Sequence, residues 1–390
     1  MLSDVELCCV LIAVGESVKK SIKKKKQKKT RKWAKQWFLD REKYTHEILL
    51  NELRICEPND FRNFLRMNGE LFDELLALVT PQIEKKNTIM RDAIPVSQRL
   101  SITLRYLATG NSFEDMKFLT AVSPQSIGQI VIETCTALIN NLKGFIKENI
   151  FSASAKEEWK EIAGEFNDLW NFPNYLGAID GKHVAIKKPP NSGSQYFNYK
   201  KFFSIVMMAV ANANYEFIMV DKQLPFTFLS DDAFALSENL MKTYPQAGLN
   251  LERRIFNYRL SRARRVIENT FGILVSRFGV LQNPIALSPE KVQIVVLACC
   301  YLHNFLRKRQ PRAYITRNYV DSEDLLAGNV ISGVWRNVVV NEATPLQPST
   351  SRNATTSAKI VRDTFCHYVN NEGQVSWQTK IVGSTTSVNN

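Results

Sequence analysis

Cysteine is scarce in this chain, and long apolar runs are absent. The seven Cys among 390 residues form no CxxC pair and no Cys/His ligand spacing. This argues against a disulfide framework and a structural zinc site, and it favours a reducing compartment. The apolar run at residues 8–14 is too short to span a membrane, and it precedes the positive charges that a signal peptide would place first. With only 16 Gly and 14 Pro, a collagen-like or mainly disordered chain is also excluded.

Positive charge is concentrated in one N-terminal segment. The chain has 51 Lys and Arg against 38 Asp and Glu, a formal net charge of +13, and residues 19–43 alone contribute +11. Such a block cannot bury itself, so residues 1–45 are predicted to form a basic, largely disordered arm. Its centre is Lys23, Lys24, Lys25 and Lys26, which could be read as a nuclear import signal or could bind nucleic acid phosphates. A solvated tail without a partner is the third alternative. We predict a nuclear protein, with the cytoplasm as a further compartment.

Residues 46–150 carry a helical pattern throughout, with apolar residues at the spacing of a buried helix face. A helix predicted over residues 100–108 stops at Gly110, a short helix follows near 113–118, and another starts at Ser123-Pro124. Helix, short helix, turn and helix is the order of a helix-turn-helix, so this region is a candidate DNA-binding unit. A small helical bundle without that role fits the spacing equally well.

From residue 175 the hydrophobic period changes to that of strands. The predicted strands lie at residues 176–186, 202–210, 216–220 and 226–229, and the predicted helices at 260–278 and 289–307. A turn at 211–214 joins the second and third strands. We predict an α/β (α+β) fold over residues 165–310, a mixed sheet with flanking helices, preceded by the all-helical region. Residues 311–390 are predicted to be a mostly disordered tail in which a short helix near 358–369 docks back.

Asp180 is the first of three candidate catalytic carboxylates. It shares a face of its predicted strand with Ala178 and Val184, residues that a core would bury. A carboxylate on such a face must be solvated, hydrogen-bonded or metal-bound, because burial of an isolated charge is very costly. The alternative is that Asp180-Gly181 forms a two-residue hairpin turn, which would leave the carboxylate in solvent.

Two further acids could join Asp180. Asp231 follows the strand at 226–229 and could point into the crevice at the edge of the sheet, or it could cap the next segment. Glu268 flanks the apolar stripe of its helix and lies one turn after Arg264, with which an ordinary surface ion pair is the alternative. Three carboxylates at one end of a sheet would form an all-oxygen site suited to Mg²⁺ or Mn²⁺. Two such ions could activate a water and stabilise the leaving oxygen in phosphodiester cleavage.

Several motifs in order are similar to those of one family. Residues 176–184 (LGAIDGKHV) resemble the first catalytic motif of PIF/Harbinger-type DDE transposases and their domesticated nuclease relatives. Further similar segments are residues 104–110 (LRYLATG), 229–236 (LSDDAFAL), 256–272 (FNYRLSRARRVIENTFG), 276–278 (SRF) and 298–304 (ACCYLHN). The resemblance covers roughly residues 45–307. It implies an RNase H-like catalytic fold in which Asp180, Asp231 and Glu268 are metal ligands.

One segment departs from the family pattern. The resemblance implies a Gly-rich turn, a further Asp and a helix between the strand ending near Val220 and the strand of the second acid. Here Asp221 leads almost directly into residues 222–226, so the domain is shortened by about one helix. Asp221 is a candidate for the missing ligand, and a solvated strand end is its alternative. We predict a transposase-derived, metal-dependent DNA endonuclease, acting by phosphodiester cleavage or strand transfer, with impaired activity. A catalytically inactive DNA-binding or scaffold protein is the alternative function, and a faulty gene assembly or a decayed element copy would also explain the gap.

Basic residues of the helix at 260–278 and just before it could contact DNA. The candidates are Arg259, Arg262, Arg264 and Arg265, which could follow backbone phosphates beside the carboxylates. A solvated helix face is the alternative. His183 and His303 have no spaced partner, so structural roles are preferred over metal ligation. The predicted partners are DNA and, as a further candidate, a separate DNA-binding protein.

Overall fold

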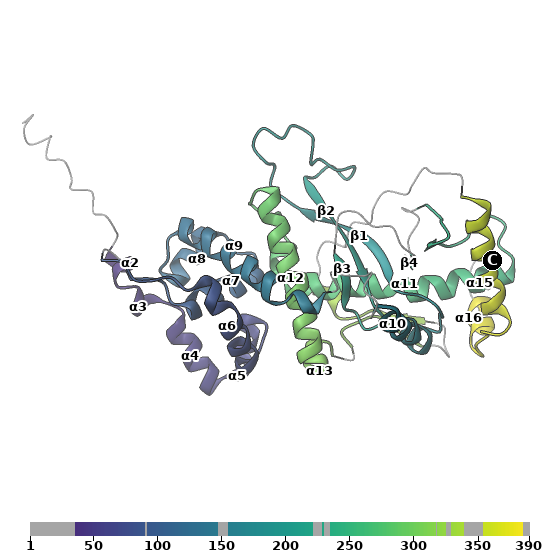
Figure 1. Cartoon of the computed structure of the whole chain (residues 1–390), viewed down its shortest axis with the longest axis horizontal. Coiled ribbons are helices and arrows are strands. Elements are labelled where there is room, and N and C mark those ends of the chain that lie inside the picture. Colours follow the sequence, from purple (N-terminus) through teal and green to yellow (C-terminus); the bar gives the residue numbers. More distant parts are fainter. Residues whose placement is uncertain are drawn as a thin grey trace, which may run out of the picture.

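The computed structural model describes residues 36–89, 92–146, 155–220, 228–229, 235–316, 318–324, 329–338 and 354–384 (Figure 1). Residues 23–26 of the predicted arm lie outside these ranges, as do Asp221 and Asp231. The described residues form a mixed helix-and-sheet structure, which confirms the predicted α+β class. Among the described helices, none has the length and apolar character that crossing a bilayer requires.

Helices make up the described chain before the sheet. They are α2 (Gln36–Leu39), α3 (Arg41–Tyr44), α4 (Glu47–Cys56), α5 (Pro58–Leu65), α6 (Gly69–Ile83), α7 (Val96–Thr109), α8 (Phe113–Thr120), α9 (Pro124–Asn141), the short helix η1 (Lys143–Phe145) and α10 (Ala155–Trp170). α7 ends where Gly110 adopts a left-handed conformation with φ 69°. Ser123 caps α9 by accepting a hydrogen bond from the Ser126 amide, and Pro124 occupies the first turn. Both predicted boundaries are confirmed, because Gly tolerates positive φ and Ser satisfies a free helix N–H.

Five strands form one sheet in the order β3-β2-β1-β4-β5. Their bounds are β1 (Ala178–Ala185), β2 (Ser204–Ala211), β3 (Phe217–Val220), β4 (Phe228–Leu229) and β5 (Leu240–Met241). β1, β2 and β3 pair antiparallel in sequence, whereas β4 lies parallel to β1 and β5 parallel to β4. In the turn between β2 and β3, the Oδ1 atom of Asn212 accepts from the amides of Asn214 and Glu216. The predicted hairpin at this turn is therefore confirmed.

Two long helices support the sheet. α11 (Leu251–Arg277) lies against β1 and β2, and α12 (Pro289–Arg309), which follows the short helix η2 (Gly279–Leu281), contacts both β3 and α9 (Figure 1). α11 starts before the predicted residue 260 because the Asn250 side chain caps it by accepting from the Arg253 amide. On α12, Asn304 accepts from the Phe217 amide and donates to the Phe217 carbonyl. These two bonds satisfy backbone groups on the edge strand β3.

The chain after α12 returns to α11. Its described elements are α13 (Pro311–Tyr314), β6 (Ser322–Asp324), β7 (Asn329–Ile331), α14 (Trp335–Val338), α15 (Thr356–Asn370) and α16 (Gln378–Ser384). α15 and α16 pack on α11, and Trp335 packs so closely over Gly272 that a Cβ there would lie 2.3 Å from the ring. α15 is the helix that we expected to dock back. The hairpin β6–β7, α14 and α16 were missed, because their stability comes from packing on the rest of the fold.

One continuous apolar core joins these parts. It runs from Leu50 in α4 to Val369 in α15 and includes residues of the sheet and of both long helices. The five cysteines that the structure describes, Cys56, Cys135, Cys299, Cys300 and Cys366, are free thiols.

Candidate active site

Asp180 lies inside a continuous strand. β1 pairs with β2 without interruption, with Asp180 opposite Ala209 and Gly181 opposite Met208. The alternative of a hairpin turn at Asp180-Gly181 is therefore wrong. Asp180 is only 8% exposed, so its carboxylate belongs to the interior of the sheet and not to a solvated loop.

The surroundings of Asp180 are polar and positively charged. Its Oδ1 atom accepts a hydrogen bond of 2.7 Å from the Gly181 amide. Lys182 lies two residues further on the same face of β1 and is 5% exposed. Burial lowers the pKa of Lys182 to about 8, although the negative charge of Asp180 acts in the opposite direction. The strand thus presents a carboxylate and an amine side by side at low exposure.

Glu268 lies on α11, the helix that packs against β1. It forms the expected ion pair with Arg264 one turn earlier. Its side chain is 34% exposed, so it is open to solvent and to a ligand. The prediction that Glu268 flanks the apolar stripe is confirmed, since Ile267 and Phe271 beside it are buried.

The second acid lies outside the described residues. β4 is described only at Phe228 and Leu229, and Leu229 pairs with Ala178 of β1 in parallel. Asp231 and the alternative ligand Asp221 both fall in the undescribed ranges. Within the part of the chain that the structure describes, no group of three His, Cys, Asp or Glu side chains gathers as a metal site.

Two of the predicted DNA-binding arginines are buried. Arg259 is 2% exposed and donates to the carbonyls of Asn171, Val369 and Gly373. Arg262 is 8% exposed and forms an ion pair of 2.7 Å with Glu323. Their guanidinium groups hold the C-terminal region on α11, so we correct our expectation that these two face DNA. It also follows that they are not part of a solvated helix face.

The other two arginines of the predicted set stay candidates. Arg264 pairs with Glu268, and Arg265 lies 3.9 Å from Glu323. Their side chains are 23% and 16% exposed. Their contact with DNA therefore stays a prediction, and both lie on α11 within four residues of Glu268.

The histidines have structural contacts. His303 is fully buried, its Nε2 atom lies 2.7 Å from the Tyr215 carbonyl and its Nδ1 atom lies 3.0 Å from the Tyr314 hydroxyl. Burial lowers its pKa to about 4. His183 contacts the Ser204 hydroxyl through Nδ1 at 2.9 Å. The preference for structural roles is confirmed for His303 by its burial.

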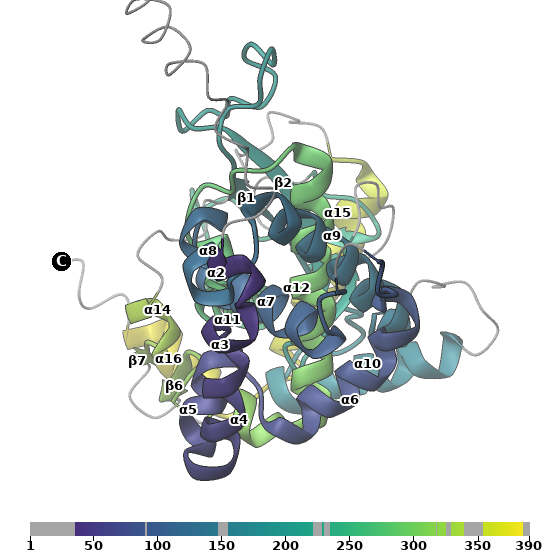
Figure 2. The ribbon, with the colours of Figure 1, turned by 90° about the vertical axis from the view of Figure 1, so that its left-hand side faces the viewer.

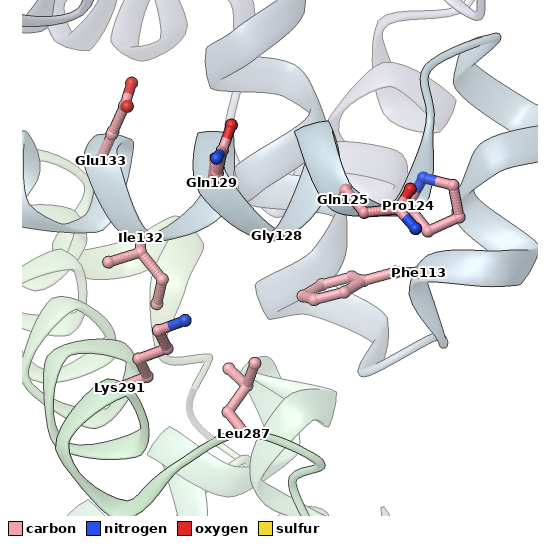
Figure 3. Close-up of a pocket in the computed structure, with 9 residues that line it drawn as sticks. All are labelled: Phe113, Pro124, Gln125, Gly128, Gln129, Ile132, Glu133, Leu287 and Lys291. Atoms are coloured by element: carbon pink, nitrogen blue, oxygen red, sulfur yellow. The ribbon is translucent and has the colours of Figure 1, made fainter.

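The helix that would read DNA in a helix-turn-helix is α9, and one edge of it is open. A hollow of about 590 Å³ lies between this edge and the start of α12. Figure 3 shows Gln129 and Glu133 projecting from α9 on one side, while Ile132 points toward Leu287 and Lys291. Glu133 is paired with Lys85 and Arg99. The exposed Gln129 is a polar group that the helical periodicity did not single out, because periodicity detects the buried face only.

Comparison with known proteins shows that the chain is similar to one group of endonucleases. Two stretches, residues 179–226 and 225–304, match the model of the DDE superfamily endonuclease. The chain is 25% identical to "Putative nuclease HARBI1" of Bos taurus over 259 residues, 59% of this chain and 72% of the relative. It is 25% identical to the protein of the same name from Homo sapiens over 257 residues, again 59% and 72% of the two chains. "Protein ALP1-like" of Arabidopsis thaliana is 20% identical over 296 residues, 64% of this chain and 71% of the relative. These matches support the resemblance of the chain to DDE superfamily endonucleases and to the Harbinger-derived nucleases. No solved structure matches it.

The family match contains all three predicted acids. Asp180 lies in the first matched stretch, and Asp231 and Glu268 lie in the second. The two stretches meet at residues 225–226. The shortening between β3 and β4 stays a prediction.

Proposed function

We propose that this chain is a transposase-derived DNA endonuclease that requires Mg²⁺ or Mn²⁺ and uses Asp180, Asp231 and Glu268 as ligands. The observation that carries the proposal is the parallel pairing of Ala178 with Leu229. Asp180 and Asp231 each follow their paired residue by two positions. In neighbouring parallel strands, paired residues point to the same face of the sheet. If the register set by Ala178 and Leu229 continued for two residues, the carboxylates of Asp180 and Asp231 would lie side by side.

An RNase H-like domain is part of the proposal. That fold has three antiparallel strands in sequence and two more strands added in parallel beside the first. The order β3-β2-β1-β4-β5 and the strand directions support it. α11, which lies on β1, would supply the third acid through Glu268.

The donor set fits a hard divalent cation. Asp180, Asp231 and Glu268 offer carboxylate oxygens only, the ligands that Mg²⁺ and Mn²⁺ prefer. When bound, such ions lower the pKa of an attacking water and stabilise charge on the leaving oxygen. The amide of Gly181 orients one oxygen of Asp180, and Arg264 orients Glu268. Lys182 adds an amine on the face of Asp180, where it can attract the phosphate of a bound strand.

Nicking of a supercoiled plasmid by the purified chain tests this function. We expect slow nicking that requires Mg²⁺ or Mn²⁺, because the sequence between β3 and β4 is about one helix shorter than the family resemblance implies, and small displacements of a ligand cost orders of magnitude in rate. DNA binding should persist without metal. Absence of nicking with either ion, together with intact DNA binding, would favour the alternative of an inactive DNA-binding or scaffold protein.

The basic arm is proposed to direct the protein to the nucleus and to add phosphate contacts, and a separate DNA-binding protein is a further candidate partner. Replacing Lys23, Lys24, Lys25 and Lys26 by Gln should reduce nuclear accumulation of a fluorescent fusion, because residues 19–43 hold +11 of the net charge of +13. The same variant should bind DNA with a weaker salt dependence, since each lost phosphate contact lowers the slope by roughly 0.9 for duplex DNA. Unchanged localisation would show that the import signal lies elsewhere.

A further inference from the structure

The connection between β1 and β2 is a positively charged projection. Residues 187–203, here named the lysine loop, extend away from the sheet in two perpendicular views (Figures 1 and 2). Lys187, Lys188, Lys200 and Lys201 are all exposed. The sequence from residue 181 to 215 contains no Asp or Glu. The lysine loop therefore carries four positive charges that its own segment does not neutralise, which favours a polyanionic partner.

Two aromatic rings accompany these charges at the surface. Phe197 is 47% exposed and Tyr199 is 45% exposed. The Phe197 ring packs edge-on against Phe203 at 5.1 Å, and the Tyr199 ring packs edge-on against His183 at 6.0 Å. Each ring is thus held on one side and open on another, as a platform for a flat ligand would be.

Hydrogen bonds within the lysine loop and at its base order it without a bound partner. The Asn198 amide donates to the Phe202 carbonyl, and the Asn198 Oδ1 atom accepts from the amides of Lys200 and Phe202. Lys201 takes the left-handed conformation that this tight turn needs, with φ 66°. At the base, the Lys187 amide donates to the Ile285 carbonyl. A loop ordered in this way loses little entropy when it binds, so its exposed groups can contribute to affinity.

We propose that the lysine loop binds an unpaired DNA strand, with bases stacked on Phe197 and Tyr199 and phosphates contacted by the four lysines. Interleaved cations and exposed rings are what a groove for single-stranded nucleic acid requires, because every base has a face that can stack. Bases inside a duplex already stack on one another, so the rings select a strand that has been opened. The inference rests on the proposed DNA substrate. Asp180 lies seven residues before Lys187, where the loop starts, roughly 23 Å at the rise of a strand, so a strand of several nucleotides bound to the loop would extend to Asp180.

The test measures binding of the full chain to a fluorescein-labelled 20-nucleotide strand and to the matching duplex, in EDTA so that no cleavage occurs. Replacing both rings (F197A and Y199A together) should weaken single-strand binding by roughly 10-fold or more and duplex binding much less, since stacking is the interaction removed. Replacing the four lysines by Gln should lower the single-strand salt slope by roughly 0.7 per lost contact. A strand that contains 2-aminopurine should lose its fluorescence on binding to the native chain and to Tyr199→Phe, but not to the double ring variant.

The control is a variant with comparable substitutions on the exposed surface of α15. Lys359 is exposed and Ile360 is 59% exposed. The double variant K359Q and I360A removes one cation and one apolar side chain more than 150 residues after the loop. This variant should bind the single strand and the duplex as the native chain does. Thermal unfolding should show that all variants fold. Equal binding of the ring variant and the native chain to the single strand, or equal weakening toward strand and duplex, would overturn the proposal. Failure of the proposed endonuclease activity is distinguishable from failure of this proposal. If the native chain never nicks DNA but the ring variant still loses single-strand binding, the role of the lysine loop stands and only the catalytic function is contradicted.

Discussion

Replacing Asp180 by Asn is expected to lower metal-dependent nicking by at least about 100-fold, the loss that follows when reacting groups are displaced by an ångström. The substitution removes the charge that would bind Mg²⁺ or Mn²⁺ while keeping the size of the side chain. An Asn oxygen can still accept from the Gly181 amide, so the strand should keep its pairing with β2. The measurement is the initial rate of plasmid nicking, together with DNA binding in EDTA, which should not change.

An exposed Asp on α10 provides the control for this experiment. Asp168→Asn removes the same charge from a helix surface, and nicking should continue at the native rate. Glu268→Gln should act like Asp180→Asn if the two acids serve one site. An Asp180→Asn chain that nicks at the native rate would mean that the reaction uses other residues, and the site assigned to β1 and α11 would have to be abandoned.

The second large effect concerns stability. Arg259→Met should lower the free energy of unfolding by about 3 kcal/mol or more, because several buried carbonyls lose their donor at once. Arg259 links the loop after α10, through Asn171, to the C-terminal helices, through Val369 and Gly373. Urea denaturation gives the change in free energy, and limited proteolysis should show α15 and α16 cut first.

Arg253→Met is the matched control, since Arg253 lies on the same helix but is exposed and contacts the face of Tyr244 in a cation–π interaction at 4.9 Å. Its cost should stay within about 1 kcal/mol. If Arg259→Met costs no more than this control, the hydrogen bonds of Arg259 do not hold the C-terminal region, and another contact must do so.

α11 serves two sides of the molecule. Glu268 and Arg264 lie on its partly exposed surface, whereas Arg259 and Arg262 face the C-terminal region. Trp335 closes over Gly272 on the same helix. The position of Glu268 therefore depends on packing from segments more than fifty residues later, so damage to the tail can reach the proposed site through α11.

Local chemistry in the sequence determined the boundaries of several elements. α7 ends at Gly110, which adopts a left-handed conformation and donates its amide to the Tyr106 carbonyl. α9 starts after Ser123, whose side chain accepts a hydrogen bond from the Ser126 amide. The turn at Asn212 follows from an Asn side chain that bonds backbone amides two and four residues on. The motifs around Asp180, Asp231 and Glu268 also indicate the resemblance, because each is contiguous in the chain and they stand in the order that the family has.

Only the tertiary structure decided where Asp180 and the arginines of α11 lie. Asp180-Gly181 fits a turn or a strand equally well, and pairing with β2 at Ala209 and Met208 excludes the turn. Arg259 and Arg262 have the pattern of surface residues because their partners, Gly373 and Glu323, are far away in the chain. A charged side chain can be buried only when distant acceptors surround it, and no pattern within one helix records where those acceptors will come from.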